Sequence, residues 1–134
     1  MPWIRRIADV TWKEIPCRSL GSTDHSGWVH VSMAPHRVFS HHWTKRYIVL
    51  KERCVYIYTS PEDSKALNVV SLTGLTVSPS GPDFITTKPN VFVVKGVACQ
   101  IYFSCEHAQD MITWLNKMGL AAIGYEAQTT SSKL

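Results

Sequence analysis

EHAQDMITWLNKMG, residues 106–119, has the pattern of an amphipathic α-helix. Its large apolar residues recur at i, i+3, i+4 and i+7 and so share one helical stripe: Met111, Trp114, Leu115 and Met118. Gly119 follows them and is expected to end the helix. An isolated helix of about four turns is only marginally stable in water. We therefore expect this stripe to pack against the structure that the preceding residues form.

The residues before the helix have the pattern of an antiparallel β-sheet. Short runs of β-branched and aromatic residues are separated by turn-forming residues, with a tight turn expected at Lys51–Glu52. Strands are expected at Trp28–Val31, Trp43–Leu50, Cys54–Thr59, Ala66–Ser71, Leu75–Ser78, Val91–Lys95 and Cys99–Cys105, with a further short strand considered at Phe84–Thr86 in a long loop. The pattern predicts a mainly β protein, with about seven strands in a closed or nearly closed antiparallel sheet and one C-terminal helix.

The chain is expected to form one domain, residues 27–120, between an N-terminal arm (1–26) and a C-terminal tail (121–134), because residues 21–26 and 128–134 are polar. The arm has two interpretations. Trp3, Ile7 and Val10 share a possible helical face near basic residues, which suits contact with a membrane or partner. We favour the other interpretation, an arm that docks on its own domain.

The composition restricts the class of protein. The chain has 134 residues, of which 45% are hydrophobic and 18% charged, as in ordinary soluble domains. A net charge of +4 favours anionic partners but is too small to indicate nucleic-acid binding. No apolar run approaches the length of a membrane span. The four cysteines form no CxxC pair, which favours reduced thiols and a cytoplasmic location.

Several of these segments, in this order, resemble the pleckstrin homology (PH) domain family: GWVHV (27–31), WTKRYIVL (43–50), CVYIY (54–58), IYFSCE (101–106) and the helix with Trp114. More narrowly, IPCRSLG (15–21) and the helix resemble the scaffold proteins called connector enhancers of kinase suppressor of Ras, and their relative that interacts with cytohesin exchange factors. The resemblance implies a seven-stranded barrel of two nearly orthogonal sheets, closed at one end by the helix.

The resemblance also implies a non-catalytic adaptor that brings a signalling scaffold of the Ras-to-kinase cascade to phosphoinositide-bearing membrane. The alternative is a module of the same fold that binds signalling proteins without significant lipid binding. The family's headgroup site maps onto Arg46 and Tyr56, but the remaining cationic positions fall on Val31 and Thr44. Two missing charge-assisted contacts, at about 1.5–3 kcal/mol each, predict weak or atypical recognition of phosphoinositides and other anionic lipids.

Strand alternation predicts a second set of cations, because Lys45 and His30 face away from Arg46 and Val31. This outer flank would also include Arg37 and His36 from the loop 32–42. In that loop, Val38 and Phe39 suit shallow insertion into an anionic membrane surface. Two alternatives stay open: Phe39 folds back onto the barrel, and Arg46 and Lys45 pair with carboxylates such as Glu52.

Other functions have weaker support. The histidines of the loop 32–42 would gain charge near pH 6.5, which favours a pH-sensitive membrane contact over a metal site, since no carboxylate or cysteine accompanies them. No catalytic motif is recognised, and neither a cofactor nor a metal is expected. Ser132-Lys133-Leu134 would be a peroxisomal signal only at a natural C-terminus, and we regard this match as accidental.

Overall fold

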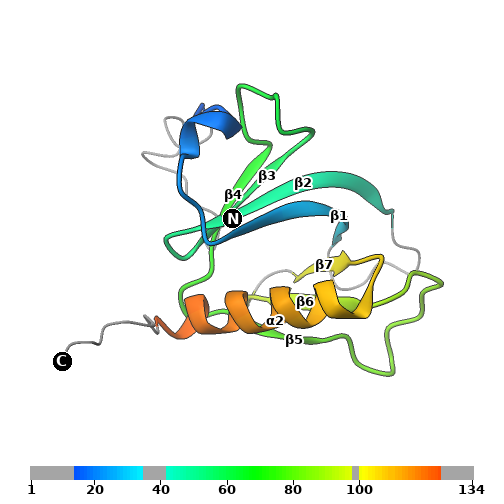
Figure 1. Ribbon diagram of the computed structural model, residues 1–134. Coiled ribbons are helices and arrows are strands. Elements are labelled where there is room, and N and C mark those ends of the chain that lie inside the picture. Colours follow the sequence, from blue (N-terminus) through cyan, green and yellow to red (C-terminus); the bar gives the residue numbers. More distant parts are fainter. Residues whose placement is uncertain (1–13, 35–41, 98–99, 125–134) are drawn as a thin grey trace.

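The computed structural model describes residues 14–34, 42–97 and 100–124, which contain seven strands, one α-helix and one short 3-10 helix (Figure 1). The 3-10 helix η1 spans Cys17–Leu20 and the α-helix α2 spans Ala108–Ile123. The strands are β1 (His25–Ala34), β2 (Thr44–Lys51), β3 (Cys54–Tyr58), β4 (Asn68–Ser71), β5 (Thr76–Pro79), β6 (Val91–Lys95) and β7 (Gln100–Ser104).

The strands form one antiparallel sheet in the order β4-β3-β2-β1-β7-β6-β5, with α2 packed on the half that contains β5 and β6. The predicted fold class, a mainly β protein with one C-terminal helix, is confirmed. Hydrogen bonding does not divide the sheet in two, because β1 pairs with β2 through residues 25–31 and with β7 through residues 30–34. Its ten residues therefore belong to both halves of the sheet.

Some predicted boundaries were wrong. The first strand, His25–Ala34, is longer than Trp28–Val31. Its two ends were not predicted because the added outward positions carry polar residues, Ser26 and Ser32, rather than β-formers. Residues 84–86 form no strand, because Phe84 is held by ring stacking on Tyr102 instead. The helix does not end at Gly119, since Leu120–Ile123 are acceptable helical residues. Gly124, with φ 79°, ends it, and its backbone N–H donates back to the last turn.

The inner core lies between the sheet and α2. Trp114 and Met118 are buried in it, and Met111 and Leu115 are partly buried against it, as the helical stripe predicts. Inward residues alternate with outward ones along the strands, and in β1 the inward residues include Val29 and Val31. The ring of Trp114 also meets the His25 ring edge to face, with 4.4 Å between ring centroids. One end of β1 is thereby fixed to the middle of α2.

The turn between β2 and β3 is tied to the end of α2. Both of its central residues, Glu52 and Arg53, have positive φ (51° and 69°), so the turn lies one residue later than predicted. A side chain at such an angle is strained. The Arg53 guanidinium donates hydrogen bonds to the carbonyl oxygens of Ala121 (2.8 Å) and Ala122 (3.3 Å). These bonds satisfy carbonyls that an α-helix leaves unpaired at its C-terminus.

A second apolar cluster covers the opposite face of the sheet. It contains outward residues of β2, β3 and β4, including Val49, Tyr56 and Tyr58, and residues of the N-terminal segment, including Ile15 and Leu20. The Tyr58 hydroxyl donates a hydrogen bond to the Ile15 carbonyl (2.8 Å). The described part of the N-terminal segment, 14–24, therefore packs on the outer face of the sheet, while residues 1–13 lie outside the described residues.

His25 makes the fold sensitive to acid. Burial and then Lys117 lower the pKa of His25 below its ordinary value, although Asp110 acts the other way. The unfolded chain therefore binds the proton more tightly, and stability that is fully present above pH 6.5 is lost as the pH falls from there through the lower pKa of the folded protein. His25→Phe keeps an aromatic ring against Trp114 and removes this titration.

We expect urea denaturation at pH 7.5 and 5.5 to show a smaller loss of unfolding free energy for His25→Phe than for the wild type. His107→Phe, at an exposed helix N-cap, is the matched control and should behave as the wild type does. The same pH dependence in all three proteins would contradict the assignment.

Candidate functional site

Arg46 lies where β2 leaves the inner core. It shares the inward face of the strand with Ile48 and Leu50, which are both buried. Its guanidinium Nη1 donates a hydrogen bond to the Lys45 carbonyl oxygen (3.0 Å). The two positions that depart from the family pattern, Val31 and Thr44, are cross-strand partners. Val31 is buried, and the Thr44 hydroxyl lies 3.4 Å from the Val31 carbonyl, so neither adds a cation beside Arg46.

Tyr56 does not belong to the same site as Arg46. In β3 the inward residues are Val55 and Ile57, whereas Tyr56 faces outward into the second apolar cluster and is 3% exposed. A shift of one residue along a strand moves a side chain to the other face. The inward residue beside Tyr56 is therefore Ile57, which carries no hydrogen-bond donor. Placing Tyr56 with Arg46 was wrong for this reason.

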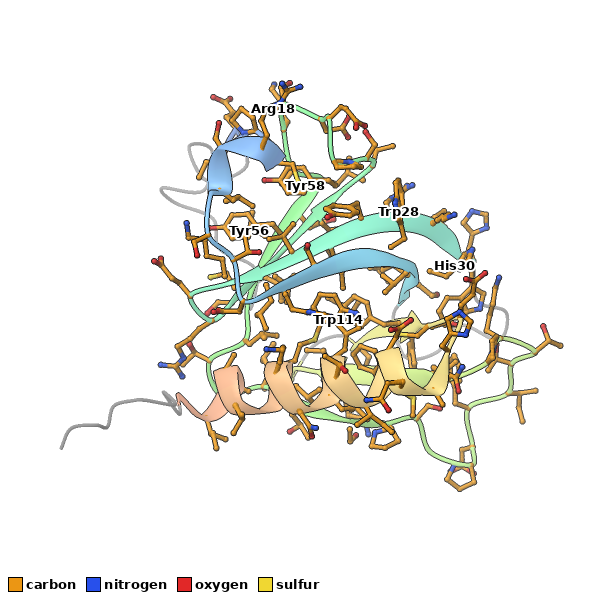
Figure 2. The ribbon with its side chains drawn as sticks, in the orientation of Figure 1. Arg18, Trp28, His30, Tyr56, Tyr58 and Trp114 are labelled. Atoms are coloured by element: carbon orange, nitrogen blue, oxygen red, sulfur yellow. The ribbon has the colours of Figure 1, made fainter. Side chains whose placement is uncertain are left out.

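The outer flank predicted from strand alternation has a compact geometry. His30 on β1 is the direct cross-strand partner of Lys45 on β2. The Lys45 ammonium lies 5.3 Å from the centroid of the Trp28 ring, within the range of a cation–π contact. Trp28 is 47% exposed and lies on the side of the sheet away from α2, whereas Trp114, on α2, points into the core between helix and sheet (Figure 2). An exposed aromatic ring and a cation therefore lie side by side.

A second lysine, Lys88, lies close enough to His30 to lower its pKa. Burial lowers the pKa of His30, and Lys88 and then Lys45 lower it further, while Glu106 raises it. His30 therefore carries little charge at neutral pH, and it takes up a proton more readily when an anion approaches. We call the surface formed by Trp28, His30, Lys45 and Lys88 the basic flank.

Sequence reasoning missed how Lys88 reaches this flank. The loop between β5 and β6 folds back over β7, where the Phe84 ring stacks on Tyr102 with 4.0 Å between ring centroids. Phe84 also meets Trp43, just before β2, at 6.3 Å. The only sequence signal was an aromatic residue in a loop that contains Gly81, Pro82 and Pro89. Its partners lie far along the chain, and local patterns do not reveal them.

The remaining predicted site residues, Arg37, His36, Val38 and Phe39, lie outside the described residues, as does Ser132-Lys133-Leu134. Insertion of the loop 32–42 into a membrane surface stays a prediction. Within the ranges 14–34, 42–97 and 100–124, none of the helices has the length and apolar character to cross a bilayer.

Comparison with known proteins gives a consistent result. A family model described as PH domain matches residues 23–122. The mouse "Interactor protein for cytohesin exchange factors 1" is 31% identical over 118 residues, which are 87% of this chain and 28% of that protein. The human "Connector enhancer of kinase suppressor of ras 1" is 28% identical over 107 residues, 79% of this chain and 14% of that protein.

Among solved structures, the PH domain of human pleckstrin homology domain-containing protein family A member 5 aligns with a TM-score of 0.65. It is 18% identical, and the alignment covers 84% of this chain and 88% of that one. This likeness concerns the fold. The chain spans about a quarter of the length of the cytohesin-interacting relative.

Proposed function

Because the chain belongs to the PH domain family, we propose that it is a non-catalytic adaptor domain that holds a signalling scaffold weakly at anionic, phosphoinositide-bearing membrane through the basic flank. The relatives are named as an interactor protein for cytohesin exchange factors and a connector enhancer of kinase suppressor of ras. Their names support an adaptor module. We extend this to a cytoplasmic host, peripherally bound to membrane, that gathers signalling proteins of the Ras and MAP kinase pathway.

The observation that carries the proposal is the Lys45–His30 pair beside Trp28. Lipid headgroups need convergent cations, and an interfacial tryptophan suits the boundary between headgroups and acyl chains. The inward site offers Arg46, whereas the positions of the family's other cations hold Val31, which is buried, and Thr44. We therefore place the principal lipid contact on the outer flank, with Arg46 in a secondary role.

The expected result of Lys45→Glu is a ten- to thirtyfold loss of affinity for vesicles containing phosphatidylserine and phosphatidylinositol bisphosphate. One cation near an anionic surface contributes about 1 kcal/mol, and reversing its charge removes about twice that. Arg46→Glu should cause a smaller loss of vesicle affinity than Lys45→Glu. Lys117→Glu, on exposed helix surface, makes the same change in net charge and is the matched control.

Vesicle sedimentation at fixed ionic strength measures the membrane affinity of the wild type and of the three variants. Equal binding by the wild type, Lys45→Glu and Arg46→Glu would exclude the membrane contact. The alternative, a protein-interaction module of the same fold without significant lipid binding, would then become the favoured function. The observation that favours this alternative is the lack of cations at positions 31 and 44, which hold Val31 and Thr44.

A further inference from the structure

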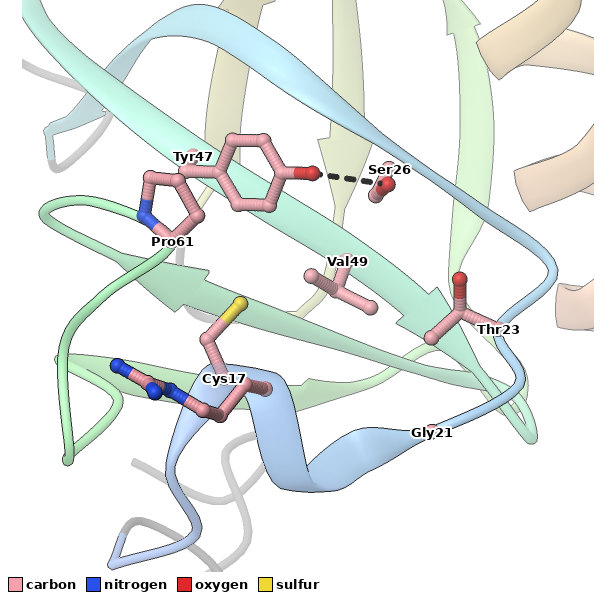
Figure 3. Close-up of a pocket in the computed structure, with 8 residues that line it drawn as sticks. Cys17, Gly21, Thr23, Ser26, Tyr47, Val49 and Pro61 are labelled. Carbon is pink, nitrogen blue, oxygen red and sulfur yellow. Dashed lines mark hydrogen bonds between the residues drawn. The ribbon is translucent and has the colours of Figure 1, made fainter.

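A pocket lies between the N-terminal segment and the outer face of the sheet (Figure 3). Its volume is about 250 Å³. A cavity of about 150 Å³ already accepts benzene, so this pocket has room for the two fused rings of an indole. No predicted site residue lines it. The lining includes residues of the N-terminal segment, of β1 and β2 and of the loop between β3 and β4: Cys17, Thr23, Ser26, Tyr47, Val49 and Pro61.

The interior of the pocket matches a tryptophan side chain. Tyr47, Val49 and Pro61 offer apolar surface, and the Cys17 thiol lies beside them. The Tyr47 hydroxyl donates a hydrogen bond to Ser26 Oγ (3.1 Å). A hydroxyl oxygen has two lone pairs, so Ser26 can accept a second hydrogen bond, from an indole N–H. A tryptophan therefore finds an apolar wall for its ring and an acceptor for its one donor.

The walls of this pocket are fixed by the fold. The Cys17 N–H donates a hydrogen bond to the Asp63 carbonyl (3.0 Å), and the Lys51 ammonium donates one to the Leu20 carbonyl. Leu20 itself is buried in the second apolar cluster. A preformed pocket binds without the entropic cost of ordering its own walls.

The segments that border the pocket are acidic. Burial, followed by Glu62 and Asp63, raises the pKa of Cys17, so both carboxylates lie close to the pocket wall. Arg18 lines the pocket and offsets only one of them. Residues 14–24 and 59–67 together carry four carboxylates and two cations: Glu14, Asp24, Glu62, Asp63, Arg18 and Lys65. Electrostatic complementarity therefore favours a basic occupant.

The chain that precedes the described residues is basic and starts beside this pocket. Residues 1–13 carry three cations and one carboxylate. Glu14, the first described residue, precedes Cys17 of the pocket wall by three residues, or at most about 11 Å. Trp3 precedes Glu14 by eleven residues, which span about 16 Å as a helix and up to about 40 Å when extended. Either conformation is long enough to bring Trp3 back to the pocket.

Trp3 fits this role better than the other tryptophan of residues 1–13. Arg5 and Arg6 follow Trp3 closely, so an apolar anchor and two cations arrive together. Trp12 precedes Glu14 by only two residues, about 7 Å at full extension, and has no arginine next to it. Arginine is the cation whose donors best match a carboxylate.

We propose that residues 1–13 dock on the domain that follows them, with the Trp3 indole in the pocket. The two arginines after Trp3 pair with Glu62, whose side chain is exposed, whereas the Asp63 carboxylate accepts hydrogen bonds from two backbone N–H groups of its own loop. Because the segment is tethered, its effective concentration at the pocket is on the order of millimolar, and weak contacts are enough to hold it. This inference does not depend on the membrane contact proposed above.

NMR spectroscopy of the whole 134-residue chain tests the docking. We expect nuclear Overhauser effects between the Trp3 indole and the Val49 methyl groups. Trp3→Ala should also shift the amide signals of Thr23, Ser26 and Val49, because these residues lose a neighbouring ring. Trp12→Ala removes the same kind of side chain from the same segment and is the matched control, which should leave these signals unchanged.

Charge reversal tests the pairing with the loop between β3 and β4. The double variant Arg5→Glu/Arg6→Glu should lower the docking equilibrium constant at least about tenfold. The pocket signals measure this constant by their position between the wild-type and Trp3→Ala spectra. Glu62→Lys should act in the same direction, and combining it with the double variant should restore docking. Asp83→Lys, on the exposed loop between β5 and β6, makes the same change in net charge as Glu62→Lys and should have no effect.

Three results would overturn the proposal. The first is a lack of the Overhauser effects together with unchanged Thr23 and Ser26 signals in Trp3→Ala. If Trp3→Ala lowered vesicle affinity at the same time, the segment would belong to the membrane contact. The second is an effect of Trp12→Ala as large as that of Trp3→Ala. The third is a set of Overhauser effects seen only between copies that carry different isotope labels, which would place the segment on a second copy.

Discussion

Trp114→Ala is expected to lower the free energy of unfolding by about 3–5 kcal/mol, the usual cost of removing a buried aromatic side chain. Trp114 is 2% exposed and lies in the inner core between sheet and helix. Its ring also contacts His25 at the start of β1. A small domain is stable by only about 5–15 kcal/mol, so this loss brings it close to unfolding.

Urea denaturation followed by circular dichroism measures the change. Ile112→Ala is the matched control, because Ile112 lies on the same helix but is 46% exposed, and it should cost about 1 kcal/mol or less. If Trp114→Ala yields no folded protein, Trp114→Phe should give a folded protein of intermediate stability. Equal costs at positions 112 and 114 would show that the helix does not close the core.

Arg53→Gly is expected to lower the free energy of unfolding by about 2–3 kcal/mol. The variant loses two charge-assisted hydrogen bonds to the carbonyls of Ala121 and Ala122. Glycine also relieves the strain of a positive φ at this position, which offsets part of the loss. The net effect therefore measures how strongly the β2–β3 turn holds the end of α2.

Glu52→Gly gives the matched control, since Glu52 has the same kind of backbone angle (φ 51°) without a contact to the helix. It should be neutral or stabilising by about 0.5–1 kcal/mol. Hydrogen exchange should show faster opening of residues 120–123 in Arg53→Gly alone. A stabilised Arg53→Gly would mean that relief of strain outweighs the bonds to α2.

The fold was predictable because its main signals are local. The stripe of Met111, Trp114 and Met118 has one helical period, and the strand alternation places Val29 and Ile48 inward. The end of α2 was predicted wrongly because the sequence does not distinguish a glycine inside a helix, such as Gly119, from a glycine that caps it. Gly124, rather than Gly119, has the left-handed backbone that the cap requires.

The candidate site was predictable only in part. Strand alternation predicted that His30 and Lys45 share a face, and the strand register adds that they are direct cross-strand partners. The same alternation, counted in register from β2, would have placed Tyr56 outward. Lys88 and the pocket beside Tyr47 depend on segments that fold back from distant positions in the chain, and no local periodicity encodes such contacts.

The packing of residues 15–20 on the outer face has a practical consequence for recombinant work. A fragment trimmed to begin at Gly27 would remove the Ile15 carbonyl that accepts the Tyr58 hydroxyl and would uncover Val49 and Tyr56. We expect such a fragment to expose an apolar surface and to aggregate. A recombinant fragment that begins at or before Glu14 keeps this surface covered by Ile15 and Leu20.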